Sequence, residues 1–512
     1  MDSSPSLLAE QLDALEQDAC ADIGSTAERI AEIDWSAESW RRFFEQMTER
    51  PPLRSPACRK MLGWIVSRAT EQLCEATSEV AWEEAAARFY RHDGARDSAS
   101  LQCLLMLFRS PNARAEALFL EGLLGAPPDD PMLLEALFRP LFQEPIRARE
   151  LFPELLQALQ HPSLAAPVLD LANFLHREFP DREHPAQSHA GELVRLLGEL
   201  AHRLGQFEEG PTADEDQFLD VSRQVAHAAS LVVALCDSVA LMELRDAIPK
   251  LYQVLDVRHR RIQVEAAAAL ARLGEAYGMK QLVRLAAEPV VRLHVLKYAE
   301  ESGCLEEIPE PYLSAYALAE ARLALALAQP DQVGVPPGEM ELVDQRRLFW
   351  PGFADRVDCC LIRFSYTSDD GMWSNIALVG PSVRFCEADL ADLAPDDIFA
   401  YYAGIDTEHD EIVHWRPEEW TADHRTEIAR WTRRLQDSGY ESIHPLLLGR
   451  FFGDWSLVAK VERQGTQGLA VIDAGGVWSV PCSGKRPLGS AEVYAIYKGR
   501  KLLRVFNQDE ET

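Results

Sequence analysis

The sequence predicts an array of α-helices over residues 1–330, followed by a smaller α+β domain with a mostly antiparallel sheet. Three observations lead to this prediction. In the first part, apolar residues recur at three- and four-residue spacing, the period of an amphipathic helix. A Pro/Gly cluster then spans 329–338. Beyond it lie seven of the eleven tryptophans and short β-branched stretches separated by glycines, which favour strands.

The composition excludes several classes of protein. The 512 residues carry a formal net charge of -31, and so acidic a surface repels phosphate backbones, which argues against a nucleic-acid partner. No stretch approaches the ~18 uninterrupted apolar residues of a membrane span. The start has no basic region ahead of an apolar one, so no secretory signal is expected. Ten cysteines occur without a C-x-x-C pair, which indicates a reducing compartment and a cytoplasmic protein.

Helices are expected wherever the three- and four-residue period is sustained. The clearest stretches are 6–18, 98–110, 112–125, 131–142, 191–205 and 223–240. The breaks between them are short and rich in Gly, Pro, Asp or Asn, the residues that end helices and form turns.

One internal repeat is visible in this helical part. Phe152–Leu159 aligns with Ile248–Leu255, and a polar turn and a helix of small residues follow each of them. A further copy begins at Met279, about 31 residues after Ile248, a typical period for two-helix repeats. Each first helix should present one apolar stripe, and each second helix should pack closely through its alanines. The residues in the best copy are Leu251, Val254 and Leu255 in the stripe, Val264, Ala267, Ala268 and Ala271 on the small face, and Gly274 and Gly278 at the turn.

The stretch Ile248–Pro289 resembles HEAT repeats, in particular the short type also found in bilin-lyase-like proteins. The resemblance covers 152–175 and 248–302. It implies an armadillo-like α-solenoid. Such arrays are usually scaffolds that bind proteins on a concave helical face, while a minority act on tetrapyrroles and another minority bind DNA. The resemblance therefore implies a fold and leaves the activity open.

The second part is expected to form one α+β domain over 339–508, after a linker at 331–338 and before an acidic tail at 509–512. Two helices are predicted at 394–404 and 421–439, the second opening on Thr421 as N-cap and closing at Gly439. The predicted strands are 356–367, 374–380, 456–463, 469–474, 477–481, 493–499 and 501–507.

A dense basic cluster stands out in so acidic a chain. It consists of Arg258, His259, Arg260 and Arg261. Two interpretations remain open. The residues belong to the turn between paired helices, where Glu243 or Glu265 neutralises some of them in a ladder between repeats. Alternatively, they form a positive spot that attracts an acidic segment of a protein partner.

Two further groups are candidate sites. Trp415 and Trp420 flank a predicted loop and are either partner-binding anchors or core residues. His409, Asp410 and His414 are candidate metal ligands, although histidines five apart do not share a face of a helix or strand. A solvated loop is the alternative for this segment, and a flexible loop is predicted around His176, His184 and His189.

Two classes of function follow. The first is a non-catalytic scaffold or adaptor built on HEAT-like repeats and acting through protein partners, with no cofactor, nucleic acid or membrane. The alternative is a lyase-like enzyme for a small molecule or tetrapyrrole, or a metal-binding enzyme, using the concave face or the loop from His409 to His414. No catalytic motif is present to favour the enzyme.

Overall fold

The computed structural model describes residues 12, 36–73, 82–94, 98–110, 112–209, 215–368, 371–481 and 487–507. The chain divides into two compact units, Met1–Gln281 and Leu282–Thr512. Consecutive helices are followed by two antiparallel sheets in the C-terminal part. The segment predicted as a linker, 331–338, lies inside the second unit. The predicted acidic tail, 509–512, lies outside the described residues.

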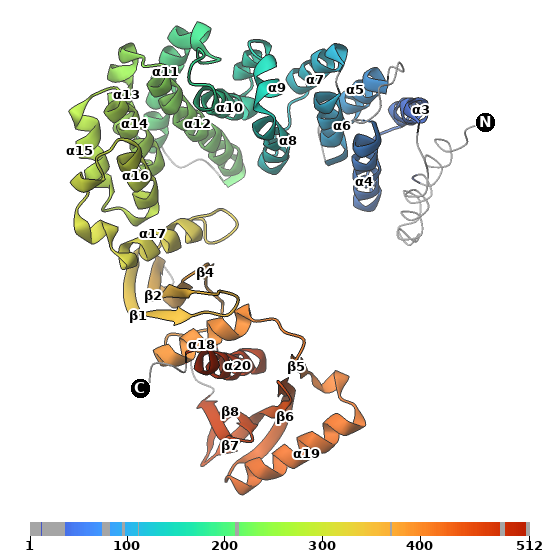
Figure 1. Cartoon of the computed structure of the whole chain (residues 1–512), viewed down its shortest axis with the longest axis vertical. Coiled ribbons are helices and arrows are strands. Elements are labelled where there is room, and N and C mark those ends of the chain that lie inside the picture. Colours follow the sequence, from blue (N-terminus) through green and yellow to red (C-terminus); the bar gives the residue numbers. More distant parts are fainter. Residues whose placement is uncertain are drawn as a thin grey trace. The chain divides into compact units, whose positions relative to one another are not determined.

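The first unit is all helical in its described part (Figure 1). Its α-helices are α3 (Ala37–Thr48), α4 (Pro56–Leu73), α5 (Trp82–Asp93), α6 (Ser98–Arg109), α7 (Ala113–Gly125), α8 (Pro131–Gln143), α9 (Pro145–Glu150), α10 (Pro162–Glu178), α11 (Ala190–Glu209), α12 (Glu215–Leu241), α13 (Ile248–Leu255), α14 (Arg260–Arg272) and the start of α15 (Ala276–Leu285). The short 3₁₀ helices are η1 (Glu154–Gln160), η2 (Gln187–His189) and η3 (Arg245–Ala247).

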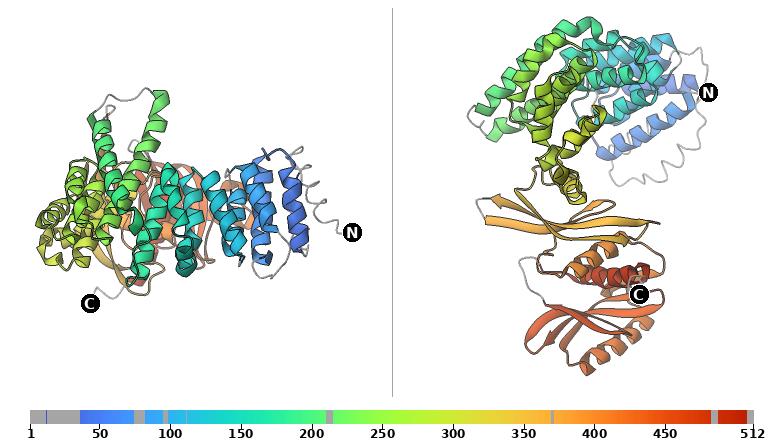
Figure 2. Two further views of the ribbon diagram at one scale, coloured as in Figure 1. Left: turned by 90° about the horizontal axis from the view of Figure 1, so that it is seen from above. Right: turned by 60° about the vertical axis from the view of Figure 1, so that its left-hand side comes forward.

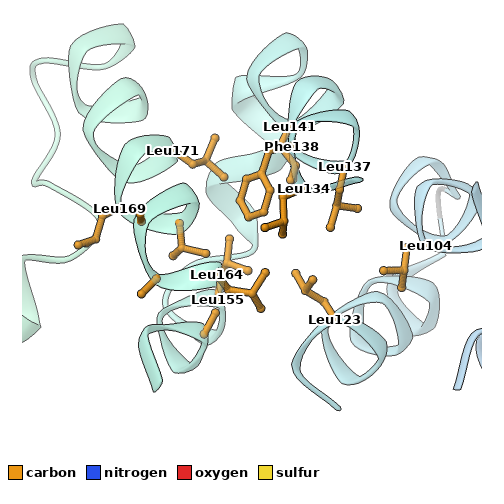
Figure 3. Close-up of a cluster of buried hydrophobic side chains, with 14 of the residues drawn as sticks. Leu104, Leu123, Leu134, Leu137, Phe138, Leu141, Leu155, Leu164, Leu169 and Leu171 are labelled. Atoms are coloured by element: carbon orange, nitrogen blue, oxygen red, sulfur yellow. The ribbon is translucent and has the colours of Figure 1, made fainter. Parts of the chain in front are cut away.

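Most of these helices pack on the helix two places further along the chain. The series α4, α6, α8, α10, α12 and α14 forms one row, and α3, α5 and α7, and then α11 and α13, lie in the other. Figure 2 shows the helices following one another side by side. One continuous hydrophobic cluster runs through the unit from Leu12 to Leu273. Figure 3 shows its middle part, where leucines of α8 and α10 meet Leu123.

The helix ends follow local sequence signals. The side chains of Ser36, Asn112 and Asp130 accept hydrogen bonds from backbone N–H groups in the first turns of α3, α7 and α8. These bonds satisfy donors that have no partner inside a helix. Proline opens α8, α9, α10 and α13, where its missing N–H costs nothing.

Two helices, α13 and α14, occupy the best copy of the predicted repeat, and two details differ from the prediction. In α13, Leu251 and Val254 are buried, and α14 is buried from Ile262 to Leu270. However, the segment aligned with α13 is the 3₁₀ helix η1. Gly278 does not end a helix: it lies in α15, where an added Cβ would lie 2.5 Å from the backbone nitrogen of Ala271. The glycine therefore permits close contact between α14 and α15, whereas Gly274 makes the turn with φ +87°.

Within α12, the stretch Arg223–Leu241 is long and apolar enough to cross a membrane by length and composition. Half of that stretch is buried inside the structure. A core helix has the same composition, and α12 packs against α10, α11 and α14. Its apolar character is therefore accounted for by packing within the first unit.

The second unit contains α16 (Pro289–Glu301), α17 (Ala315–Leu327) and the short η4 (Leu305–Glu307) and η5 (Glu310–Leu313) before its sheets. The first sheet is a meander of β1 (Glu339–Phe349), β2 (Arg356–Ser368), β3 (Gly371–Val379) and β4 (Val383–Arg384). The second has the order β5 (Ile412–Trp415), β6 (Glu441–Phe451), β7 (Asp454–Arg463), β8 (Thr466–Asp473) and β9 (Gly476–Pro481). All strand pairs are antiparallel, as predicted.

Helices cover both faces of both sheets. Alternate residues of β2 illustrate this, because Ile362 packs on α17 while Leu361 packs on the pair α18 (Pro395–Asp406) and α20 (Ser490–Phe506). In β7, Val458 faces α20 and Leu457 faces α19 (Ala422–Asp437). The layers are therefore α17, the first sheet, α18 with α20, the second sheet, and α19 (Figure 1).

The prediction of strands at 493–499 and 501–507 is wrong. This segment is the single helix α20, and Gly499 lies within it. An added Cβ at Gly499 would lie 1.7 Å from the carbonyl oxygen of Ala400 in α18. The tyrosines and β-branched residues favour a strand locally, but they sit at helical spacing and are buried by α18 and both sheets. Packing overrides local propensity here.

The second unit repeats one order of elements. A helix, a four-stranded meander and a helix occur as α17, β1 to β4 and α18, and again as α19, β6 to β9 and α20. The final helices share a pattern, with Phe399-Ala400-Tyr401-Tyr402-Ala403-Gly404 matching Tyr494-Ala495-Ile496-Tyr497-Lys498-Gly499. The contact between these helices is reciprocal, because Gly499 faces Ala400 and Gly404 faces Ala495.

Candidate functional site

The strongest candidate site is a groove of about 690 Å³ in the first unit, lined by α8, α10 and α12. Its apolar lining includes Leu134 and Phe138 of α8, Ala166 and Pro167 of α10, and Ala226 of α12. Figure 3 shows Leu134 and Phe138 within the cluster of buried side chains, so the same residues line the groove and belong to the core. We call this feature the α8–α10–α12 groove.

Large residues of α8 and small residues of α10 line the groove. Its lining combines Phe138 and Phe142 of α8 with the small residues Ser163 and Ala166 of α10. Phe142 is held by an edge-to-face contact with Phe174, with ring centroids 5.1 Å apart. An apolar hollow bordered by a few polar groups is the usual form of a binding site.

The charged residues at the groove differ in their partners. Glu135 and Arg139 form an exposed ion pair at 2.8 Å on α8. Asp170 of α10 has no ion-pair partner within 4.0 Å among the described residues. Arg223 and His227 of α12 complete the charged border. Asp170 is therefore the carboxylate that an arriving group can engage without breaking an existing pair.

Asp170 lies beside a row of charges that crosses α10, α12 and α14. Asp237 of α12 accepts from Arg177 at 2.5 Å and from Arg272 at 3.0 Å. Buried Glu265 of α14 pairs with Arg261 at 2.7 Å. Each of these arginines is thus engaged by another carboxylate, and none of them forms an ion pair with Asp170.

This environment changes the acidity of Asp170. Desolvation by the packed helices, followed by the charges of Asp237 and Glu265, raises the pKa of Asp170 to about 7, and Arg177 and Arg261 oppose this shift. Solvent still reaches the side chain in the groove. A carboxyl group with such a pKa is half protonated at neutral pH and gains charge when a cation approaches.

The predicted basic cluster lies in the turn between α13 and α14 and at the start of α14. His259 is the N-cap of α14, and its ring accepts a 3.5 Å hydrogen bond from the backbone N–H of Ile262. Arg260 donates to Gln263 at 3.0 Å. The Arg261–Glu265 pair supplies the predicted neutralisation by Glu265. The docking role of this cluster stays a prediction.

Arg258 borders a second, more polar hollow of about 600 Å³ between α11 and α13. Gly198 and Lys250 meet there, and a Cβ added to Gly198 would lie 2.8 Å from Cδ of Lys250. The missing side chain makes room for the long lysine. Asp256 lies beside the two cations, so the hollow has no uniform charge.

The two predicted anchor tryptophans are half-buried against the second sheet and α19. The ring of Trp415 lies 4.4 Å from that of His424 and 5.6 Å from that of Trp455. Trp420 donates through its indole nitrogen to the carbonyl of Trp415 at 3.1 Å. These contacts give both residues a packing role, and their role in partner binding stays a prediction.

The candidate metal ligands do not converge. His409 lies against Phe452 and accepts from the backbone N–H of Glu411, whereas His414 is in β5 with its ring against Tyr494. Asp410 is exposed in the turn between them. Among the described residues, three or more His, Cys, Asp or Glu side chains are nowhere gathered as a metal ion requires.

The histidine loop before α11 is more ordered than the sequence predicts. His184 is buried, accepts from the N–H of Ala186 and donates to Oδ1 of Asn173 at 3.0 Å. Asn173 is also bonded to Ser238, which joins the loop to α10 and α12. Burial, followed by the nearby His176, lowers the pKa of His184 to about 4, so the ring is neutral at pH 7.

No protein-family model matches the chain, and neither a curated protein nor a solved structure is significantly similar to it. The site is therefore interpreted from its own residues. Sequence reasoning missed the groove, although one signal was present: the small residues Ser163 and Ala166 recur at three-residue spacing in α10. A pattern of that kind does not reveal whether a neighbouring helix fills the space.

Proposed function

We propose that this chain is a non-catalytic protein-binding scaffold of the cytoplasm whose first unit is an α-solenoid of HEAT-like repeats. The α8–α10–α12 groove receives a segment of the partner protein. The observation that carries this proposal is the groove itself: about 690 Å³ of largely apolar space on three helices of one row. Grooves between helices are a common way to hold an apolar peptide face.

The packing order supports the solenoid part of the proposal. Helices two places apart pack on each other in two rows, and their apolar faces form one continuous cluster. This arrangement is typical of repeat arrays. The buried free cysteines Cys58, Cys103 and Cys236 support a reducing location, because they serve as small apolar core residues.

Filling the groove tests the proposal. Ala226 is exposed in the groove, and Ala226→Trp places a large ring there. Gln224→Trp puts the same ring on an exposed position of α12 outside the groove. Peptides selected from a random display library on the full-length protein serve as ligands, and fluorescence anisotropy measures their affinity.

We expect Ala226→Trp to weaken the selected peptides by at least about tenfold, the effect of losing a central contact. Gln224→Trp should leave their affinity unchanged. Equal binding to the wild type and to Ala226→Trp, by every selected peptide, would remove the groove as the partner site.

A further inference from the structure

We propose that the partner segment held in the α8–α10–α12 groove is apolar and carries one lysine or arginine that pairs with Asp170. This inference rests on the proposed function and names the chemistry of its partner. It follows from the charges at the groove and from the pairs that those charges already make.

Asp170 is the one groove carboxylate that needs a partner. The other groove carboxylate, Glu135, has Arg139 at 2.8 Å. Asp170 has no cation within 4.0 Å in the described part of the chain. It is therefore a carboxyl group without an ion pair in an otherwise largely apolar groove, and a single basic side chain complements its ionised form.

The charges on the neighbouring helices are already paired with one another. On α12, Asp237 binds Arg177 and Arg272, and on α14, Glu265 binds Arg261. Those arginines are held by their own carboxylates and do not reach Asp170 within ion-pair distance. Desolvation is the largest cause of the raised pKa of Asp170, about 7, and a cation bound beside the carboxyl group would favour its ionised form.

The affinity for the basic partner segment should depend on pH, because Asp170 must be ionised to pair with it. The pKa of about 7 belongs to the free protein, and a bound cation favours the ionised form. Affinity should therefore rise with pH and be about tenfold higher at pH 8 than at pH 6. His227 of α12 and Arg223 also border the groove. His227 gains positive charge on acidification, so it needs its own control.

The experiment uses the peptides selected on the full-length wild-type protein. Each tight binder is compared with a copy in which its lysine or arginine is replaced by glutamine. Binding is measured to the wild type, Asp170→Asn, Glu135→Gln and His227→Gln at pH 6 and pH 8. Thermal melting of each variant shows that it is folded, which we expect for Asp170→Asn because water reaches this side chain.

We expect the binders to contain a basic residue within an apolar stretch. Asp170→Asn and the peptide change to glutamine should each weaken binding about tenfold, as charged hydrogen bonds do. They should not add when combined, because they remove the same pair. Glu135→Gln should change affinity less than about threefold, and His227→Gln should keep most of the pH dependence.

The outcomes separate this inference from the proposed function. Binders that lose affinity in Ala226→Trp but are indifferent to Asp170→Asn would overturn the inference and leave the groove as a binding site. Selected peptides that contain no lysine or arginine would also overturn the inference and leave the groove as a binding site. Indifference to Ala226→Trp itself would instead remove the proposed function.

Discussion

The two halves of the second unit have the same backbone plan and different polar contacts. In both, the last helix carries alanine and glycine four residues apart, Ala400 with Gly404 and Ala495 with Gly499. Each glycine lies against the other helix's alanine. Small residues at this spacing let two helix backbones approach closely, so both halves need them for the same reason.

The charges at matching positions are opposite. Two residues after the glycine stands Asp406 in α18 and Lys501 in α20. Asp406 accepts from Trp350 at 3.2 Å and pairs with Arg384 at 3.1 Å. Lys501 pairs with Asp473 at 2.9 Å. Close contact between the helix backbones requires glycine at this position in both halves. Two residues further on, a charge of either sign is tolerated because each charge forms an ion pair.

The largest expected effect comes from the shared glycine contact. In Gly499→Ala the new Cβ would lie 1.7 Å from the oxygen of Ala400, and in Gly404→Ala 2.0 Å from that of Ala495. The helices must separate, so each change should lower the free energy of unfolding by several kcal/mol. Gly191→Ala in α11 is the control, because its Cβ meets nothing within 4 Å. Denaturant unfolding of the full chain measures all three, and unchanged stability in either test variant would contradict the reciprocal contact.

The matching tyrosines should respond unequally. The hydroxyl of Tyr402 is fully buried and donates to the carbonyl of Ile376 at 2.7 Å. That of Tyr497 donates to Asp473, which keeps Lys501 and the N–H of Gly475 as partners. Tyr402→Phe should therefore cost about 1–3 kcal/mol, the loss of a buried hydrogen bond, and Tyr497→Phe less. Equal losses in urea unfolding would show that the two polar networks are equivalent.

Acid should weaken the second half through Asp473. Burial raises the pKa of this carboxyl, but hydrogen bonds from Lys501 and Tyr497 outweigh it and leave the pKa below its usual 3.8. A carboxyl group whose pKa is lowered by folding stabilises the folded state at pH values above its usual pKa. This stabilisation is lost as the pH falls through the folded-state pKa. In Asp473→Asn this part of the acid sensitivity should disappear. Melting temperatures between pH 6 and pH 3 measure it, with Lys501→Gln as the partner variant, and an identical profile in Asp473→Asn would assign the sensitivity to other groups.

The smallest effect is expected from cutting the chain between the halves. Asp410 lies in the exposed turn before β5, so a protease site inserted there should be cleaved without harm. The paired helices α18 and α20 should hold both pieces together, since their contact is buried and extensive. Size-exclusion chromatography of the cut protein should show one peak. Two separate peaks after cleavage would mean that the intact chain is needed to keep α18 and α20 together.

Some elements could be predicted from sequence because their signals are local. The boundaries of α19 match the prediction: Thr421 accepts from the N–H of His424, and Gly439 has φ +83° after the helix. In such cases a residue and its chain neighbours supply the whole interaction.

Other elements depended on partners far away in the chain. His184 was expected in a flexible loop, but Asn173 and Ser238 fix it from α10 and α12. The α8–α10–α12 groove is lined by residues of three helices, which are far apart in the chain. Neither arrangement is encoded within one stretch of sequence, because each is a property of two surfaces brought together.

By itself the sequence determined the helical first part, the antiparallel second part and the helix ends set by caps and glycines. Tertiary structure alone decided that 490–506 is helical, that Gly278 and Gly499 are contact points, and that Asp170 is left without an ion-pair partner among the described residues. The physical reason is distance along the chain. Capping and turn formation involve neighbouring residues, whereas burial and charge pairing are settled when distant helices meet.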